Sequence, residues 1–391
     1  MTSRRVLVVA CAVQLLLALG CLPVKTGRGV PPDRLDDAEF WGLHAGLSEP
    51  AGTFRTDNLV SNERGLPEVL PEVARRASAG AAYIGVGPEQ NFSYIAALGP
   101  RVAFIVDIRR DNAMLHLLYK ALFELSATRA EFLSRLFARP LSKHLRAESS
   151  ANDLLEAAAV GSPSRELFAA NLAQVRAELS GRHRWPVNDA DFAAIARIYE
   201  AFFVAGPGIS YSFGSFRRSQ QFPTYAELMT AGDALTGSYL ASDEAYRRVR
   251  ECQLQNLVVP VVGDFSGSRA LVGIGAFLRA RSLTVAVFYA SNVEMYLFRG
   301  DGWKKFYGNL SSLPIDTRSI LVRSVFSGFS RGFFGGGSGT PGSGAGPPGA
   351  RPGTQGGGPS GVLWTDPIES LVADVVRGDV STYGELLARM R

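Results

Sequence analysis

Glycines and polar residues follow four short apolar segments of this 391-residue chain, at the points where strands would end. Gly85-Val86-Gly87 follows the first segment, and Asp107 follows the second. Gly263-Asp264-Phe265 follows the third, and Ser291-Asn292-Val293-Glu294 follows the fourth. In an open parallel sheet the ligand lies beyond the carboxyl ends of the strands, near the point where the strand order reverses. The pattern therefore predicts a ligand site to which all four segments contribute.

The first two segments have the residue types that bind a nucleotide-like ligand. A glycine turn lets the backbone approach a ligand, and an acid about twenty residues further along binds ribose hydroxyls in dinucleotide-binding folds. Asp107 stands at about that distance after Gly87. The third glycine of the dinucleotide fingerprint is absent, and Gln90-Asn91 occupy that region. Taken alone, the stretch fits a cofactor cradle and an ordinary strand, turn and helix equally well.

The elements around these residues alternate in the order of an α/β sheet. Apolar runs that predict buried parallel strands cover residues 83–86, 102–106, 257–262 and 283–289, and a late strand is expected over 319–326. Helices are expected over 92–98 and 269–281. A long stretch with helical spacing, 113–255, separates the second strand from the third. We expect a Rossmann-like α/β fold with a mostly parallel sheet, flanking helices and a large helical insertion between strands two and three.

The chain divides into five parts. A signal peptide (1–21) precedes a linker with a short helix (22–50), and the Rossmann-like domain covers residues 51–330. Residues 331–361 are rich in Gly, Pro and Ser, which is typical of a flexible linker. The last part, 362–391, is expected to be helical, with Asp366 as its cap and Pro367 as its first residue. Its apolar face needs a groove, which we expect on the same molecule.

Composition excludes several classes of protein. Hydrophobic residues make up 46% of the chain and charged residues 20%, as in globular proteins. The net charge of +5 is mild, and no run of Lys and Arg alternates with aromatic residues, so nucleic-acid binding is not expected. The four histidines do not pair at metal-ligand spacing, so we expect no metal site.

The N-terminus has the features of an export sequence. Arg4-Arg5 precede an uncharged apolar stretch, 6–20, that is short for a transmembrane helix. Leu17-Ala18-Leu19-Gly20-Cys21 resembles a bacterial lipobox, and Ser3-Arg4-Arg5-Val6-Leu7 resembles a twin-arginine signal. We expect an exported protein of the cell envelope, anchored to the membrane by a lipid on Cys21. A signal of the ordinary secretory type, an uncleaved anchor and a cytoplasmic location are the alternatives.

The four strand-end segments together resemble the class I S-adenosylmethionine-dependent methyltransferase family. The motifs YIGVGPEQNF, DIRR, GDF and SNVEMYLF also resemble a group of bacterial proteins, some of them lipoproteins, over most of residues 40–325. The first resemblance implies S-adenosylmethionine as cofactor and an unknown small-molecule ligand or methyl acceptor as partner. Since S-adenosylmethionine is a cytoplasmic metabolite, export leaves a second function open: a non-catalytic lipoprotein that keeps the fold to bind a ligand or a partner.

The methyltransferase resemblance also implies roles for individual residues. The residues it places at the cofactor are Gly85, Gly87, Glu89, Asp107, Asp264 and Phe265. Asp107 would bind the ribose hydroxyls, and Gly263-Asp264 would contact the adenine. Asn292 would orient the acceptor, and Glu294 would take its proton as a general base. Alternatively, Glu294 caps a helix or pairs with an arginine.

Two further features have two interpretations each, and a third, His116, has one. The polar cluster at Ser61-Asn62-Glu63 either closes over the cofactor or supplies a helix cap through Ser61. Arg109-Arg110 either binds an anion or is a solvated pair, and His116 is expected to be packed in the interior.

Replacing the predicted lipidated cysteine tests the anchor. Cys21→Ser removes the thiol that would carry the lipid, so we expect the variant to lose labelled palmitate and to leave the membrane fraction. Cys11→Ser, a matched change outside the lipobox, should keep both. Wild-type protein that is full-length, unlabelled and soluble in the cytoplasm would contradict the prediction.

Overall fold

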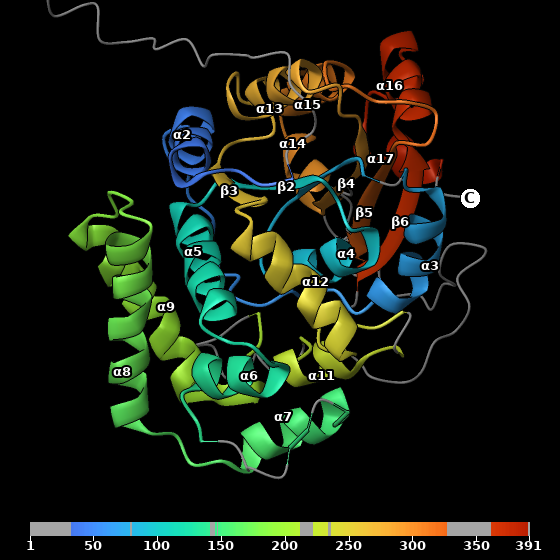
Figure 1. Ribbon diagram of the computed structural model, residues 1–391. Coiled ribbons are helices and arrows are strands. Elements are labelled where there is room, and N and C mark those ends of the chain that lie inside the picture. The colour runs from blue at the N-terminus through green and yellow to red at the C-terminus, as the bar shows by residue number, and fades with distance from the viewer. Residues whose placement is uncertain are drawn as a thin grey trace, which may run out of the picture.

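A six-stranded sheet forms the centre of the protein (Figure 1). The computed structural model describes residues 33–78, 80–140, 145–146, 148–211, 222–233, 236–326 and 361–389. The strands are β1 (Ala82–Gly85), β2 (Val102–Asp107), β3 (Val258–Val262), β4 (Val285–Ser291), β5 (Ile320–Phe326) and β6 (Gly361–Pro367). Every residue of β1, β2 and β3 is buried, which agrees with their uninterrupted apolar sequences.

The strand order is β3-β2-β1-β4-β5-β6. Strands β1 to β5 are parallel, and β6 runs antiparallel to β5. The order reverses between β1 and β4, which is the switch point where Rossmann-like sheets bind their ligands. The predicted fold class is therefore confirmed: the protein is a mixed α/β structure with a mostly parallel sheet.

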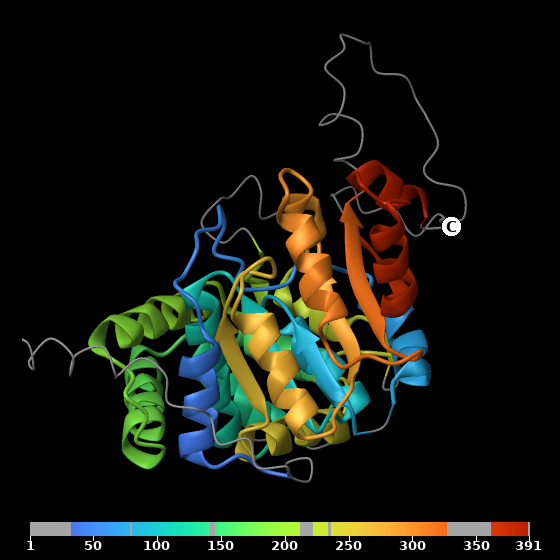
Figure 2. The same ribbon diagram turned by 90° about the horizontal axis from the view of Figure 1, so that it is seen from above.

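Helices cover both faces of the sheet (Figures 1 and 2). One face carries α2 (Asp37–Leu47), α13 (Ala270–Ala280) and α15 (Gly302–Ser311). The other carries α4 (Gln90–Leu98), α5 (Arg110–Glu124) and α12 (Asp243–Leu254), while α3 (Leu66–Arg76) packs beside β6 and α4. The short helix α14 (Val293–Leu297) follows β4 directly.

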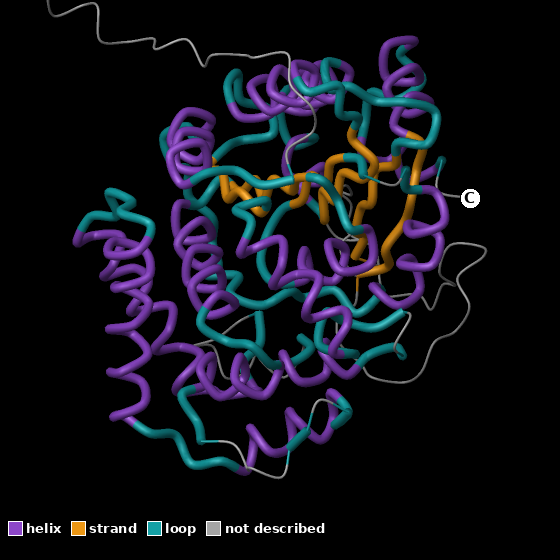
Figure 3. The backbone as a smooth tube through the Cα atoms, in the orientation of Figure 1, coloured by secondary structure: helices purple, strands orange, loops and turns teal. Residues whose placement is uncertain are grey.

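The described residues between α5 and α12 are mostly helical and lie to one side of the sheet (Figure 3). Their elements are α6 (Arg129–Phe137), α7 (Ala151–Val160), α8 (Arg165–Arg176), the π-helix η1 (Ala177–Arg182), α9 (Asp189–Ala205), the 3-10 helix η2 (Gly206–Gly208) and α11 (Tyr225–Thr230). This agrees with the expected helical insertion. The insertion begins only after α5, because α5 is the crossover helix that packs on β2 and β3.

The free edge of β3 is covered by α2, which matches the short helix expected within residues 22–50, and by the residues that follow it. Nδ1 of His44 donates to the carbonyl of Pro260 at 2.8 Å. The Val262 N–H donates to Ser48 Oγ at 3.0 Å, and the Glu49 N–H donates to the Val262 carbonyl at 2.8 Å. The segment from α2 to Glu49 is thus part of the folded body.

The C-terminal segment differs from the expectation because it begins with a strand. Asp366 does not cap a helix: it lies in β6 opposite Leu321, and its carboxylate binds Arg323 at 2.8 Å. Pro367 precedes α16 (Ile368–Arg377) instead of opening it, and α17 (Tyr383–Ala388) follows. The expected apolar face is present, since Ile368 and Leu371 are buried. The segment therefore docks on its own molecule, as expected.

No helix within the described ranges is long and apolar enough to cross a membrane. The predicted lipid site at Cys21 and the linker 331–361, apart from Gly361, lie outside the described residues.

Removing residues 361–391 tests the contribution of the last strand. The truncation exposes the edge of β5, leaves Arg323 without Asp366, and uncovers the surface beneath Ile368 and Leu371. Burying each of those two apolar side chains stabilises by about 1.5–3 kcal/mol. We expect the free energy of unfolding to fall by about 3 kcal/mol or more in thermal or urea unfolding. Deleting about ten residues within 335–355 is the control, since loop length changes stability slowly. Equal stability of the truncated and full chains would contradict the prediction.

Candidate ligand site at the strand ends

A cavity of about 330 Å³ lies at the carboxyl ends of the first four strands. Its walls come from the turn after β1, the end of β2, the loop after β3 and the end of β4, and from the segment ahead of α3. The residues that line it include Phe54, Asn58, Ser61, Asn62, Gly87, Asp107, Arg109, Asp264, Phe265, Tyr289, Ser291, Asn292 and Tyr296. The volume is within the range of small-molecule sites, about 300–1,000 Å³. The structure thus brings the predicted segments together at the switch point of the sheet.

The turn after β1 is held by side chains that sequence reasoning did not assign to the site. Nδ2 of Asn91 donates to the carbonyls of Val86, Gly87 and Pro88 at 2.9, 3.1 and 2.7 Å. Nε2 of His116 donates to the Gly87 carbonyl at 2.9 Å. Burial lowers the pKa of His116 to about 4, so its imidazole is neutral at pH 7. Gln90 stands where the dinucleotide fingerprint has its third glycine, and Asn91 follows it directly; this polar pair was the available clue.

The two predicted glycines differ in what they do. Gly87 lines the cavity and has φ +78°, a conformation that favours glycine. Gly85 does not line the cavity. A Cβ there would lie 1.9 Å from Asn91 Oδ1 and 2.6 Å from the Tyr83 hydroxyl, which bond to each other at 2.8 Å. Gly85 therefore makes room for the pair that holds the turn.

Glu89 lies behind the cavity wall, not at the cavity. It is fully buried at the start of α4, and both carboxylate oxygens accept from the Ser61 N–H, at 3.1 and 3.2 Å. Burial raises the pKa of Glu89 to about 7. Direct contact between Glu89 and a ligand is not supported, because the residue supports the Ser61 segment that lines the cavity.

Asp107 lines the cavity but is already bound. Its Oδ1 accepts from the backbone N–H and Nε of Arg109, at 2.9 and 3.0 Å, and its Oδ2 accepts from Nη2 at 2.8 Å. Both side chains are more than nine-tenths buried. Arg109 is therefore neither a solvated group nor an unpaired cation that is free to bind an anion. Arg110 is a half-exposed partner of Asp191. A carboxylate has about four acceptor positions, so Asp107 has about one left for a ligand.

The loop after β3 is held in place by Glu49, which is not part of the sheet. Glu49 accepts from the N–H groups of Asp264, Arg269 and Ala270, at 3.2, 2.7 and 3.1 Å, and so occupies the start of α13. Asp264 accepts from Ser266 through one oxygen. Phe265 lines the cavity while it packs on Phe306 and Phe288. Both predicted residues of this loop therefore reach the cavity.

The end of β4 separates the two predicted catalytic residues. Asn292 lines the cavity. Glu294 does not, because its buried carboxylate accepts from the Tyr307 hydroxyl and lies 3.5 Å from Nε of Arg323. The role of Glu294 as a general base is thus not supported, and the alternative, a pair with an arginine, describes its contacts.

A second buried carboxyl lies behind the β4 wall. Glu63 is 1% exposed and accepts from the Tyr289 hydroxyl at 2.7 Å and from the Ser291 hydroxyl. Burial raises the pKa of Glu63. Ser61 caps no helix, since α3 begins after Gly65. Within the polar cluster, Ser61 and Asn62 therefore line the cavity, while Glu63 lies in the protein interior.

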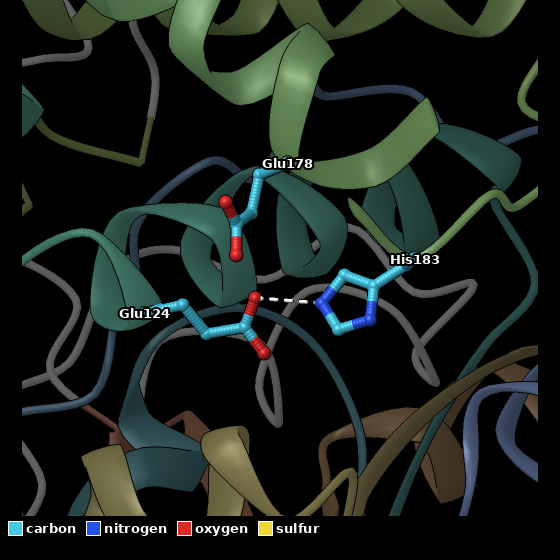
Figure 4. A group of neighbouring side chains, drawn as sticks. All are labelled: Glu124, Glu178 and His183. Atoms are coloured by element: carbon cyan, nitrogen blue, oxygen red, sulfur yellow. Dashed lines mark hydrogen bonds and ion pairs between the residues drawn. The ribbon is translucent and has the colours of Figure 1, made fainter. Parts of the chain in front are cut away.

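A second group of titratable side chains lies away from the cavity (Figure 4). Glu124, Glu178 and His183 could approach one metal ion, but their charges have protein partners. Glu124 binds Lys120 at 2.9 Å and His183 at 2.8 Å, and Arg182 binds Glu178. We interpret the group as an ion-pair network that joins α5 to η1.

Fold and site define a Rossmann-like α/β protein with a small-molecule cavity at its switch point. The chain belongs to the family described as a domain of unknown function, DUF7790, which matches residues 58–205 and 212–333. The matched residues contain all four strand-end segments and stop before β6. No curated protein matches the chain.

Glu89→Gln tests the buried carboxyl behind the turn. The folded state raises the pKa of Glu89 from 4.5 to about 7, so this group lowers the stability of the wild type as the pH rises from 4.5 to 7. A shift of this size corresponds to roughly 3 kcal/mol. We expect Glu89→Gln to gain about that much over the wild type at pH 8 and little at pH 4, measured by urea unfolding. Glu148→Gln, at an exposed position, is the control. A stability difference that does not change with pH would contradict the assignment.

Proposed function

We propose that the chain binds an adenosyl compound of the S-adenosylmethionine type in the cavity and transfers its methyl group to a small-molecule acceptor. The observation that carries the proposal is the meeting of four strand ends around one cavity at the switch point. Gly87 and Asp107 lie on one side of the reversal, and Ser291 and Asn292 lie on the other. In this arrangement the cofactor side and the acceptor side of the site come from different halves of the sheet.

The turn after β1 favours a nucleoside ligand without a phosphate chain. Dinucleotide folds place the diphosphate at the N-terminus of the first helix, where free N–H groups receive it. Here Pro88 has no N–H group, and the buried carboxyl of Glu89 stands at the start of α4. The first turn of α4 thus offers few donors and holds an acid. S-Adenosylmethionine carries no phosphate, so this feature does not work against it.

The pair between Asp107 and Arg109 sets a condition on ribose binding. Asp107 can accept one ligand hydroxyl at Oδ2 while Arg109 stays in place. Two hydroxyls would require Arg109 to release the carboxylate. Because Asp107 is already paired with Arg109 in the free protein, its loss should reduce stability as well as ligand binding.

A non-catalytic ligand-binding protein is the second candidate. The contacts of Glu294 favour it, since the carboxylate that was expected to act as base is bound to Tyr307 and Arg323 outside the cavity. The predicted lipid anchor also fits this function. Binding of an adenosyl ligand without methyl transfer to any cell extract would favour this candidate.

Calorimetry with S-adenosylmethionine, S-adenosylhomocysteine, NAD⁺ and ATP tests the proposal. We expect the two adenosyl compounds to bind and the two phosphate-bearing nucleotides to bind at least tenfold more weakly, because Pro88 offers no N–H group to a phosphate and the acid of Glu89 lies behind the wall at the start of α4. Asp107→Ala should lose about 3–5 kcal/mol of stability, since Arg109 would remain buried without its partner.

The double variant Asp107→Ala/Arg109→Met separates binding from folding. It removes both charges, so we expect near wild-type stability and at least tenfold weaker binding of S-adenosylhomocysteine, equivalent to about 1.4 kcal/mol. The single variant Arg109→Met keeps Asp107 and should still bind. Unchanged affinity in the double variant would show that Asp107 does not hold the ligand, and failure of both adenosyl compounds to bind the wild type would overturn the proposal.

A further inference from the structure

The wall of the cavity at the end of β4 contains two residues, Ser291 and Tyr289, whose hydroxyl groups are bonded to a carboxyl group behind the wall. Ser291 lines the cavity, and its hydroxyl donates to Oε1 of Glu63. Glu63 itself does not line the cavity; it is 1% exposed and reaches the wall through Ser291 and Tyr289. The Tyr289 hydroxyl donates to the other oxygen of Glu63 at 2.7 Å. The two wall residues therefore share one buried carboxyl group.

The backbone at Ser291 is shaped to make this contact. Ser291 has φ +50°, in the left-handed region that non-glycine residues seldom adopt. The register between β4 and β5 shifts between Tyr289 and Ser291, so an extra residue of β4 is accommodated there. Strained residues of this kind persist where the surroundings over-determine them, and they cluster at ligand sites.

The direction of the hydrogen bond decides what Ser291 offers to a ligand. A hydroxyl has one donor and two acceptor positions, and the Ser291 proton points to Glu63. Only acceptor positions of Oγ are then left for the cavity. The part of the ligand beside Ser291 must therefore carry an O–H or N–H group.

Apolar and aromatic side chains also line the cavity. Phe54 packs edge-on against Tyr296 at 5.3 Å between ring centres, and Val293 and Leu297, which follow Ser291 in the chain, are lining residues as well. Such walls favour an apolar ring over a charged or sugar-like group.

We infer that the second ligand of this cavity is a small apolar molecule with a hydroxyl group, of the phenol type, which donates its proton to Ser291 while Glu63 orients Ser291. This inference rests on the proposed function. In the methyl transfer the hydroxyl oxygen attacks the methyl carbon of the sulfonium, and the bond from carbon to sulfur breaks with its electron pair left on sulfur. The phenolic proton passes to Ser291 Oγ, whose own proton passes to ionised Glu63. Ser291 touches the ligand, and Glu63 acts through it as a positioning residue and proton acceptor.

The ionisation of Glu63 adds a pH dependence. Burial raises the pKa of Glu63, while hydrogen bonds with Ser291, Tyr289, Ser324 and Gln90 lower it. Other titratable groups that interact with it are Tyr83 of β1 and Tyr94 of α4. Protonated Glu63 would donate to Ser291 and release the serine proton toward the cavity. The preference of the cavity for a ligand that donates a hydrogen bond to Ser291 should therefore be strongest at high pH.

Binding of para-cresol and 4-fluorotoluene tests the inference, because fluorine replaces the hydroxyl at similar size and cannot donate. The measurement is ligand-detected NMR titration of the full chain, with and without S-adenosylhomocysteine, at a series of pH values from 5 to 9. We expect para-cresol to bind about tenfold more tightly than 4-fluorotoluene at the highest pH, and this preference to shrink as the pH falls and Glu63 takes up a proton. Ser291→Ala should abolish the preference, and Glu63→Gln should make it independent of pH. Ser126→Ala, a change of the same size at a buried serine that neither lines the cavity nor interacts with Glu63, is the control for folding.

The possible outcomes distinguish a failure of this inference from a failure of the proposed function. Equal binding of the two probes to the wild type overturns the inference, and so does a preference that survives in Ser291→Ala. Absence of S-adenosylhomocysteine binding overturns the proposed function alone, since the probes are also titrated without it. If Ser291→Ala does not fold, the pH dependence of the preference in the wild type and in Glu63→Gln decides, and a wild-type preference that is equal over the whole pH series counts against the inference.

Discussion

The ligand cavity depends on the hydrogen bonds that hold the turn after β1. Asn91 binds three successive carbonyls of that turn, and His116 binds the Gly87 carbonyl from α5. Both side chains are buried, so these carbonyls are directed into the protein and their hydrogen bonds are protected from water. The turn, the first helix and the crossover helix are thereby locked together. The other walls of the cavity are arranged around this fixed corner.

The buried acids around the cavity fall into two groups, which differ in the partners that bind their carboxyl groups. Asp107 and Glu294 are buried beside arginines, so their charges are compensated within the protein. Glu63 and Glu89 are buried among neutral donors, and burial raises the pKa of both. The first group gives the site its rigidity. The second group keeps its protons to higher pH than free carboxyl groups do, and Glu89, with a pKa of about 7, can exchange a proton near neutral pH.

The strands and their ends were predictable because their signal is local. Unbroken apolar runs placed β1 to β4, and the polar residues after them placed Gly87, Asp107, Asp264 and Asn292 at the cavity. The partners of those residues were not predictable. Arg109 binding Asp107, and Arg323 binding Glu294, depend on side-chain directions that sequence spacing does not contain. The strand β6 was missed because Pro367 and the apolar face of α16 resemble a helix start, whereas pairing with β5 is a long-range choice.

The covered edge of β3 has a consequence for how the protein behaves among its own copies. A free edge strand exposes N–H and C=O groups that can pair with a strand of another molecule. In β3 the middle residue, Pro260, has no N–H group and its carbonyl is bound by His44, while both backbone groups of Val262 are bound by Ser48 and Glu49. This side of the sheet has therefore little capacity to template a further strand. The segment ahead of the Rossmann-like domain thus protects the protein against edge-to-edge aggregation. It also fixes the loop that borders the cavity.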